Sequence, residues 1–555
     1  MAPDVMVHER NGNRGLDRGE RLVTARLTLV YPILFALFPV LAFLAENIQE
    51  TLISSAYRSA SIAVVGAVGS LVLFRVLFRD WHKAAIFSAL CIVLFSSYGH
   101  VYEVLKSARI AGVLVGRHRL LLPLTLTILL SGAWLIIKKI RNPRSISEGL
   151  LVVSLFLLVY PIYSLVDYEV RSSNRRTFEL DTLPATSSGS GITADSFPDV
   201  YYIILDGYVR SDVLREVYGY DNSSLLSFLR ARDFFVAEKA TSNYTLTGLS
   251  LASSLNMQHL LGDFAGRERK DYPSMLRGLM LHSRTRTLLE TLGYKTVAVE
   301  SGWKASEFVN ADHYLQPQGT DVVRLRESGA INPFESMYIR TTALLALIDM
   351  GTISGSSLLI DFEAPFVARH YYILTQFDYL AQMPRISGPK FVFVHIISPH
   401  GPYVFGPNGE LLASSKAFTL AGDVGSEGSQ KSEITLYRDQ TEFITKKMVE
   451  TIETILAESE VPPIILLQAD HGPGIGLDWD NPSEQALVER MSILSAYLLP
   501  DSCMDSLYPT ITPVNSFAVL FSCVFNIEHE YQEDRNYFSS PRDPYQFIDV
   551  SAIVQ

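Results

Sequence analysis

The chain of 555 residues contains only three cysteines, so neither a disulfide-rich scaffold nor a cysteine-based zinc site organises it. Cys91 lies in an apolar stretch, whereas Cys503 and Cys523 can pair in an oxidising compartment or stay free. Positive charge is also scarce, since 47 Lys and Arg against 58 Asp and Glu give a net charge of −11. This balance argues against a nucleic-acid partner.

Long apolar stretches are confined to the first third of the chain. A helix needs about 20 apolar residues to cross a bilayer, and two of the five stretches reach that length without their flanking residues. Little polar chain separates the stretches, which favours a transmembrane domain over buried helices of a soluble core. We expect five transmembrane helices within residues 27–166. The stretches are 27–45, 60–74, 84–95, 120–137 and 149–166.

Basic residues set the expected orientation, because they collect in cytoplasmic loops. Five arginines precede the first stretch, and more Lys and Arg lie between the second and third stretches and between the fourth and fifth. The loop after the third stretch is basic as well and weakens this pattern. On balance we expect residues 1–26 in the cytoplasm and everything after Val166 outside. The first stretch lacks a small-residue cleavage site, so we interpret it as an anchor.

A second domain is expected after the membrane region. Residues 167–197 include a run rich in Ser, Gly, Thr and Pro that is typical of a linker. In residues 198–555, apolar segments of strand length alternate with helical stretches, which indicates an α/β domain with a mostly parallel sheet flanked by helices. The strand-like segments are 200–205, 296–299, 391–397 and 464–467.

The pair Asp470-His471 closes the last of these segments, and Gly472-Pro473-Gly474 ends it abruptly. Open α/β folds bind their ligands at the carboxyl ends of parallel strands. A carboxylate and an imidazole are suitable ligands for zinc or manganese. Taken alone, the pair also fits a helix N-cap beside a surface histidine.

Further candidate ligands stand at two other strand-like segments. Asp206 ends the first, His395 lies within the third, and His400 follows it closely. Each has an ordinary explanation: a turn at Asp206, a hydrogen-bonded core histidine at 395 and a loop position at 400. Because a parallel sheet collects such residues along one edge, these positions together with Asp470-His471 favour a metal site.

Hydroxyl side chains in residues 241–255 stand directly before a run of small residues that suits a helix. A hydroxyl at a helix N-terminus faces free N–H groups and the positive end of the helix dipole, which suit a phosphate or sulfate. A metal ion can lower the pKa of such a hydroxyl enough to make it a nucleophile. Ordinary helix capping accounts for the other hydroxyls of this segment.

In this order, the motifs resemble those of the alkaline phosphatase/sulfatase superfamily, and most closely its membrane-anchored phosphoethanolamine transferases and lipoteichoic acid synthases. The transferases carry Cys-Gly-Thr-x-Thr-Ala-x-Ser-Val-Pro-Cys around their nucleophile. Residues 243–253 match that motif without gaps and place Thr247 at the nucleophile and Thr245 two residues earlier. The His-x4-His-Gly-Pro motif matches residues 395–402, and Asp-His-Gly matches residues 470–472. These families also place five spans before an extracytoplasmic catalytic domain.

The resemblance implies a site for one divalent ion, zinc or manganese. The implied metal ligands are Asp206, Thr247, Asp470 and His471. The implied catalytic residues are Thr247 and His400, and the residues implied to bind substrate are His395, His400 and Thr245. The resemblance also implies an integral protein of a bacterial inner or plasma membrane, with its catalytic domain outside the cytoplasm.

The chain departs from the transferase pattern in several places. Both cysteines of the nucleophile motif are absent, and Asp206 stands where the transferases use Glu. No histidine follows His471 until His529, although those enzymes offer a further metal ligand there. A second metal and the identity of the donor lipid therefore stay open. No Cys/Ser-x-Pro-x-Arg motif follows Tyr244, which disfavours a sulfatase reaction.

We therefore expect a metal-dependent transferase anchored in the membrane. It would move a phospho-group, such as phosphoethanolamine or glycerophosphate, from a membrane lipid donor to a lipid or glycan acceptor of the cell envelope. The expected intermediate is a phospho-threonine. Two alternatives stay open: a phospho- or sulfo-ester hydrolase with the same site, and a non-catalytic membrane protein with a degenerate sulfatase-like domain.

Overall fold

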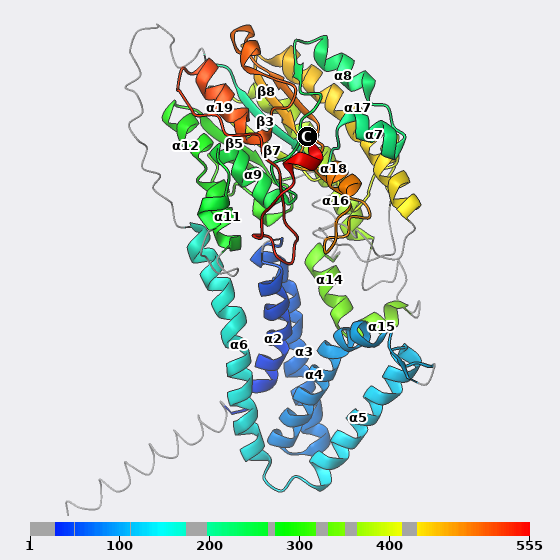
Figure 1. Ribbon diagram of the computed structural model, residues 1–555. Helices are drawn as coiled ribbons and strands as arrows, with labels where there is room; N and C mark the ends of the chain where they lie inside the picture. The colour runs from blue at the N-terminus through cyan, green and yellow to red at the C-terminus, as the bar shows by residue number, and fades with distance from the viewer. Residues whose placement is uncertain are drawn as a thin grey trace, which may run out of the picture. The chain divides into compact units, whose positions relative to one another are not determined.

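The computed structural model describes residues 28–48, 50–110, 113–173, 197–264, 272–317, 331–349, 363–412 and 430–555. The chain divides into two compact units (Figure 1). The first comprises residues 1–167 and 332–360, and the second comprises residues 168–331 and 361–555. The return of residues 332–360 to the first unit has no counterpart in the sequence prediction. The predicted cytoplasmic segment, residues 1–26, lies outside the described residues.

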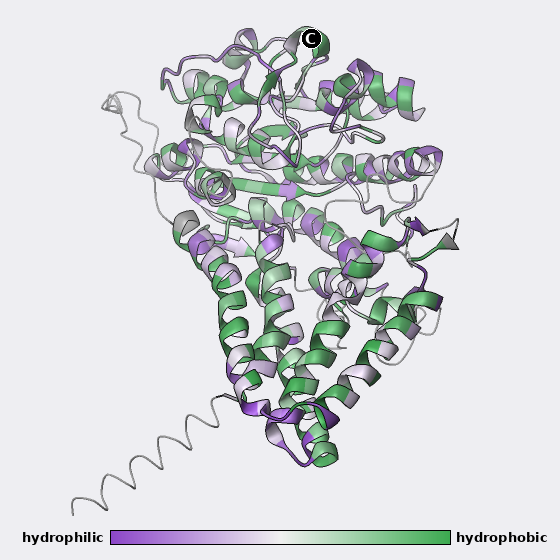
Figure 2. Cartoon of the chain, turned by 60° about the horizontal axis from the view of Figure 1, so that its bottom comes forward, coloured by the Kyte–Doolittle hydropathy of each residue, from purple (hydrophilic) through white to green (hydrophobic). Residues whose placement is uncertain are grey.

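The first unit is built mainly of apolar helices, which are green over most of their length in Figure 2. Many of their large apolar side chains are exposed, as Leu77, Trp134 and Phe156 show. The helices are α2 (Tyr31–Glu46), η1 (Ile53–Ala56), α3 (Tyr57–Phe78), α4 (Trp81–Leu105), α5 (His118–Lys138) and α6 (Pro143–Ser173), and the short strands β1 (Arg109–Ile110) and β2 (Val113–Leu114) lie between α4 and α5.

Four segments among the described residues are long and apolar enough to cross a membrane. They are Ile53–Phe78, Trp81–Leu105, His118–Lys138 and Pro143–Val170. Helix α2 is also apolar, but it has 16 residues, fewer than the roughly 20 that span a bilayer. The prediction of five spans is therefore not confirmed. Helix α6 continues to Ser173, so residues 167–173 of the predicted linker are helical, and residues 174–196 lie outside the described residues.

The returning segment carries α14 (Pro333–Thr341) and α15 (Leu344–Asp349). Asn332 is the N-cap of α14, and its side chain forms a reciprocal capping box with that of Glu335. Arg58 at the start of α3 donates from Nε to Glu335 Oε1 at 2.7 Å. Glu335 is buried, so this ion pair and the cap fix α14 against the N-terminal end of α3.

The second unit is an α/β domain around a seven-stranded sheet. The strands, in spatial order, are β4 (Phe235–Val236), β9 (Ser495–Leu498), β8 (Ile464–Gln468), β3 (Val200–Leu205), β7 (Lys390–Ile396), β5 (Lys295–Val299) and β6 (His313–Leu315). The five strands from β8 to β6 are parallel, and β9 pairs antiparallel with both β8 and β4. The sheet is therefore mixed, and its antiparallel edge departs from the expected parallel arrangement.

Helices cover both faces of this sheet. Tyr202 of β3 is hydrogen-bonded through its hydroxyl to Ser254 of α9 (Thr247–Asn256) at 2.8 Å and packs on Phe517 of α19 (Pro513–Val524). Tyr208, just beyond β3, is hydrogen-bonded to Thr445 of α17 (Gln430–Glu458). Helix α17 in turn packs against α16 (Ala364–Gln382). The remaining helices are α7 (Ser211–Tyr218), α8 (Ser223–Arg230), α10 (Leu261–Phe264), α11 (Tyr272–Leu281), α12 (Arg284–Thr291), α18 (Glu484–Met491) and α20 (Ser551–Val554).

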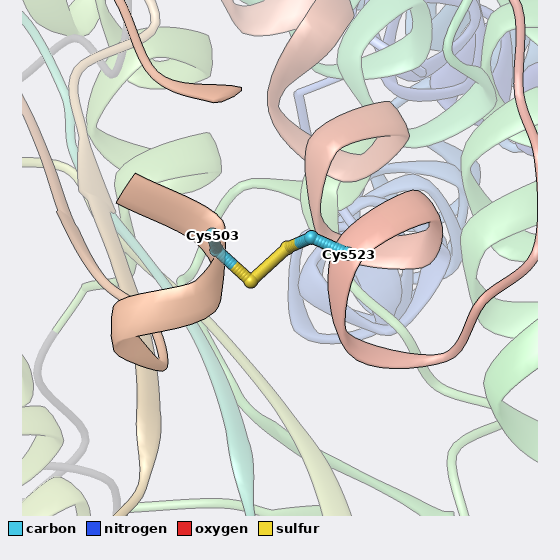
Figure 3. The surroundings of a disulfide bond; sticks show 2 residues. All are labelled: Cys503 and Cys523. Carbon is cyan, nitrogen blue, oxygen red and sulfur yellow. A yellow bond between two sulfur atoms is a disulfide. The ribbon is translucent and has the colours of Figure 1, made fainter. Parts of the chain in front are cut away.

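One disulfide joins Cys503 of η6 (Asp501–Ser506) to Cys523 of α19 (Figure 3). The structure thus settles the pairing that the sequence left open, while Cys91 has a free thiol. Helix α19 packs against α9, the helix that begins with Thr247. The disulfide therefore fixes an element that supports the candidate site.

Candidate metal centre

Two adjacent parallel strands deliver the carboxylates of the candidate site. Strand β3 pairs with β8 in a register that places Ile204 opposite Gln468. Asp206 and Asp470 each follow two residues later, so they lie side by side at the carboxyl edge of the sheet. The Gly207 N–H donates to Asp470 Oδ1 at 3.2 Å and joins the two strand ends. The predicted convergence of Asp206 and Asp470 is present in the structure.

Asp206, Asp470 and His471 form a compact buried group. One ligand atom from each lies within 4.8 Å of the others, and all three side chains are at least 95% buried. His471 Nε2 is 3.1 Å from Asp470 Oδ2 and 3.9 Å from Asp206 Oδ1. Among the described residues, no other group of this kind was found.

The chemistry of this group fits a divalent cation. Asp206 Oδ1 and Asp470 Oδ2 have no hydrogen-bond partner in the part of the chain that the structure describes. A buried carboxylate oxygen without a partner costs several kcal/mol, and a bound cation removes that cost. Two carboxylates and one imidazole are a common ligand set for zinc and manganese.

Backbone carbonyls fix the protonation of the histidine rings. His471 Nδ1 lies 2.9 Å from the Gly472 carbonyl oxygen, and His400 Nδ1 lies 2.7 Å from the Gly401 carbonyl oxygen. A carbonyl only accepts, so each Nδ1 carries the proton. The Nε2 lone pair of neutral His471 therefore points to the carboxylates, as a metal ligand requires.

Thr247 is the first residue of α9, and its half-buried side chain reaches the same group. Its Oγ1 lies 2.9 Å from His471 Nε2 and donates its proton to that nitrogen. Ser250, one turn later, donates from Oγ to the Asp470 carbonyl at 2.8 Å and ties the helix to the ligand loop. The start of the helix also presents free N–H groups and the positive end of the dipole.

Burial and neighbouring charges shift the pKa of each member of this group. Burial raises the pKa of Asp206, but attraction by His400 and the hydrogen bond from His395 outweigh burial and hold this pKa well below its usual value. Burial and repulsion by Asp206 raise the pKa of Asp470 to about 7. Burial, followed by the charge of Arg490, lowers the pKa of His471 well below its usual value and keeps the ring neutral.

The two histidines of the predicted pair differ in accessibility. His395, on β7, is fully buried, with Nε2 at 3.2 Å from Asp206 Oδ2 and Nδ1 at 2.8 Å from Ser306 Oγ. His400 is half-buried; its backbone N–H donates to the Asp206 carbonyl, and its ring centroid is 6.1 Å from that of His471. His400 is therefore the more accessible of the two histidines.

Thr245 does not fit the predicted substrate contact. Its side chain is fully buried, and Oγ1 donates to the Ser539 carbonyl at 2.8 Å and accepts from the Ser539 N–H at 3.1 Å. With both hydrogen-bonding functions used by one backbone unit, this hydroxyl holds the loop before α9 in place. In this structure Thr245 therefore supports the loop, and its contact with substrate stays a prediction.

Sequence reasoning missed two side chains that support the candidate site through neighbouring residues. Ser306 holds His395, and Arg490 of α18 bonds the loops on either side of the site. Arg490 stands 20 positions after Asp470 in a short amphipathic helix. No motif marks either residue, because their contacts exist only in the folded chain.

No family model and no curated protein matches this chain. Among solved structures, it is similar to the C-terminal periplasmic domain of EptC from Escherichia coli in complex with zinc (11% identity, TM-score 0.40, 64% of this chain and 96% of that one). It is also similar to the lipooligosaccharide phosphoethanolamine transferase A of Neisseria meningitidis (11%, 0.39, 92% and 96%). A third similar structure is a sulfatase-type protein of Bacteroides fragilis (13%, 0.36, 62% and 77%).

Proposed function

We propose that this protein is a metal-dependent phosphotransferase anchored in the membrane, with Thr247 as its nucleophile. It moves a phospho-group, such as phosphoethanolamine or glycerophosphate, from a membrane lipid to a lipid or glycan acceptor of the cell envelope. The observation that carries the proposal is the meeting of the Thr247 hydroxyl with His471 Nε2, beside two buried carboxylate oxygens that lack partners.

The metal ligands in this proposal are Asp206, Asp470, His471 and Thr247. A divalent ion held there, zinc or manganese, lowers the pKa of the threonine hydroxyl and neutralises charge on the phosphate oxygens. The buried, neutral ring of His471 and the two carboxylates supply this ligand set.

The transfer takes two balanced steps. In the first, Thr247 Oγ1 loses its proton to solvent and forms a bond to phosphorus, while the bond between phosphorus and the alcohol oxygen of the donor lipid breaks. Protonated His400 gives its Nε2 proton to that leaving oxygen. In the second, neutral His400 takes a proton from the acceptor hydroxyl, which attacks phosphorus and releases Thr247, and the threonine oxygen regains a proton from solvent.

The remaining residues orient the phosphate. The N–H groups at the start of α9 face a phosphoryl group bound to Thr247, which stabilises its negative oxygens. His395, held by Ser306, adds a further buried polar group beside Asp206. This arrangement stabilises charge where it develops during the transfer.

We also propose that the second unit lies outside the cytoplasm of a bacterial cell, at the inner or plasma membrane. The disulfide between Cys503 and Cys523 supports this placement, because disulfides persist in oxidising compartments. The four apolar helices anchor the chain where its lipid donor is found.

The test uses the purified full-length protein with zinc and phosphatidylethanolamine or phosphatidylglycerol labelled in the headgroup. We expect a labelled adduct that chelation prevents, that Thr247→Ala abolishes and that Thr247→Ser retains. Thr291→Ala, an exposed helical threonine, is the matched control and keeps the adduct. An adduct on Thr247→Ala protein would contradict the nucleophile assignment. Headgroup released to water instead of an added acceptor would identify a hydrolase.

A further inference from the structure

One arginine side chain connects the two loops that form the candidate site. Arg490, on the last turn of α18, is 5% exposed. Its Nε and Nη2 donate to the Thr245 carbonyl at 3.0 and 2.8 Å. Its Nη1 donates to the carbonyls of Gly472 and Pro473 at 2.8 and 3.0 Å. The guanidinium thus joins the loop that leads into Thr247 to the loop that follows His471.

The Gly472 carbonyl has a second role. It accepts from His471 Nδ1 at 2.9 Å as well as from Arg490 Nη1 at 2.8 Å. This carbonyl sets the tautomer and the ring orientation of His471, so a group that fixes the carbonyl also fixes the imidazole. On the other loop, the Thr245 carbonyl lies only two residues before Thr247.

The backbone of α18 holds the same loop from the other side. The Gly472 N–H donates to the Arg490 carbonyl at 2.6 Å, and Glu489 Oε1 accepts from the Ile475 N–H at 3.0 Å. A Cβ atom on Gly472 would lie 2.1 Å from the Glu489 carbonyl oxygen, so only glycine allows this approach. The ligand loop is therefore clamped against the end of α18.

We propose that Arg490 is a positioning residue that sets the placement of Thr247 relative to His471. It touches neither substrate nor metal, and it acts through the carbonyls of Thr245 and Gly472. The proposal rests on the proposed function, because it takes Thr247 and His471 to share one metal ion. A planar guanidinium with several fixed donors reaches both loops at once, whereas the single ammonium of lysine cannot match this geometry.

The competing explanation is that Arg490 only stabilises the fold, since it is buried and also lies over the Trp479 ring at 5.4 Å. Arg286 of α12 provides a matched control for that explanation. It is 7% exposed and donates to the carbonyls of Leu281 and Asn310 at 3.1 and 2.7 Å. The partners of its side chain among the described residues lie outside the candidate site; they are Glu290, Leu281, Asn310 and Phe308.

The experiment compares Arg490→Met, Arg490→Lys and Arg286→Met in the full-length protein. Zinc affinity is measured by competition with a chelator, and the absorption spectrum of the cobalt(II)-loaded protein reports ligand geometry. Loss of an outer partner of a metal ligand weakens metal binding about 10–100-fold, and we expect Arg490→Met to fall in that range with an altered cobalt spectrum. Arg490→Lys is expected between wild type and Arg490→Met.

The control and the kinetics separate positioning from stability. Arg286→Met is expected to lower the melting temperature while zinc affinity and the cobalt spectrum stay at wild-type values. In headgroup transfer, Arg490→Lys is expected to lower kcat with KM within twofold of wild type. If Arg490→Met does not fold, zinc affinity of Arg490→Lys decides the question.

The outcomes also separate this proposal from the proposed function. Wild-type zinc affinity and an unchanged cobalt spectrum in a folded Arg490 variant would overturn the positioning role. A wild-type protein that binds zinc but forms no adduct on Thr247 would overturn the proposed function, while the zinc comparison would still test Arg490. A wild-type protein without stoichiometric zinc binding would overturn both.

Discussion

Replacing Asp470 with asparagine tests whether the site binds a cation. We expect the variant to be more stable than the wild-type protein without metal and less stable than the wild-type protein with metal. In the metal-free protein the substitution removes a buried negative charge that is repelled by Asp206. Asparagine keeps an oxygen for the Gly207 N–H, now 3.2 Å from Oδ1. Its amide nitrogen takes the place of Oδ2, 3.1 Å from His471 Nε2, which removes the repulsion between this oxygen and the lone pair of Nε2.

The magnitude follows from the pKa of the aspartate. Burial and Asp206 raise the pKa of Asp470 to about 7, above its unfolded value. A group with a raised folded pKa adds stability that is fully present below the unfolded pKa, about 4 for aspartate, and is lost as pH rises through about 7. Above pH 7 the charged wild-type side chain therefore costs the metal-free protein up to about 4 kcal/mol, at about 1.4 kcal/mol for each pKa unit between about 4 and about 7, and Asp470→Asn recovers this stability.

Zinc reverses this order. A ligand at about 100,000 times its Kd stabilises the native state by about 7 kcal/mol, and the wild-type protein is expected to gain that amount while Asp470→Asn gains far less. Unfolding is followed in one detergent at pH 8 and pH 4, with chelator or with zinc. Asp378→Asn, an exposed substitution on α16, is expected to change stability by less than about 0.5 kcal/mol throughout. Lower stability of Asp470→Asn than wild type in chelator at pH 8 would refute the reasoning.

Three further predictions address the surroundings of the site. Cys503→Ser opens the disulfide across 20 residues and is expected to cost about 3 kcal/mol in denaturant unfolding, whereas Cys91→Ser leaves stability unchanged. Thr245→Val is expected to cost about 1–2 kcal/mol of stability with KM unchanged; a raised KM would restore its role in substrate binding. Ser306→Ala removes the Nδ1 partner of His395 and is expected to lower the transfer rate about tenfold without changing zinc affinity.

Much of the candidate site could be predicted because its residues stand at the ends of continuous apolar strands. Asp206 and Asp470 follow β3 and β8, and parallel pairing in the observed register brings them together whatever the sequence between the strands. The helix after Thr247 was likewise visible as a run of small residues. Local patterns of this kind survive in a single sequence, since strand length and polarity depend on neighbouring positions.

The features that could not be predicted depend on contacts between distant segments. Strand β9 has four residues and pairs with β8, and β4 has two residues and pairs with β9, so no periodicity marks either strand. Arg490 is an ordinary residue of a short helix until the fold places Thr245 and Gly472 beside it. For Thr245, the position in the motif predicted a contact with substrate, whereas in the folded chain its hydroxyl bonds the backbone of Ser539.

Tandem mass spectrometry of the full-length protein, quenched during turnover with headgroup-labelled phospholipid and zinc, tests the central claim most directly. We predict a single labelled phosphoryl adduct on Thr247, which is absent in chelator and is lost when an acceptor is added. A labelled adduct on another residue, or headgroup transfer that proceeds at the wild-type rate in Thr247→Ala, would contradict the account.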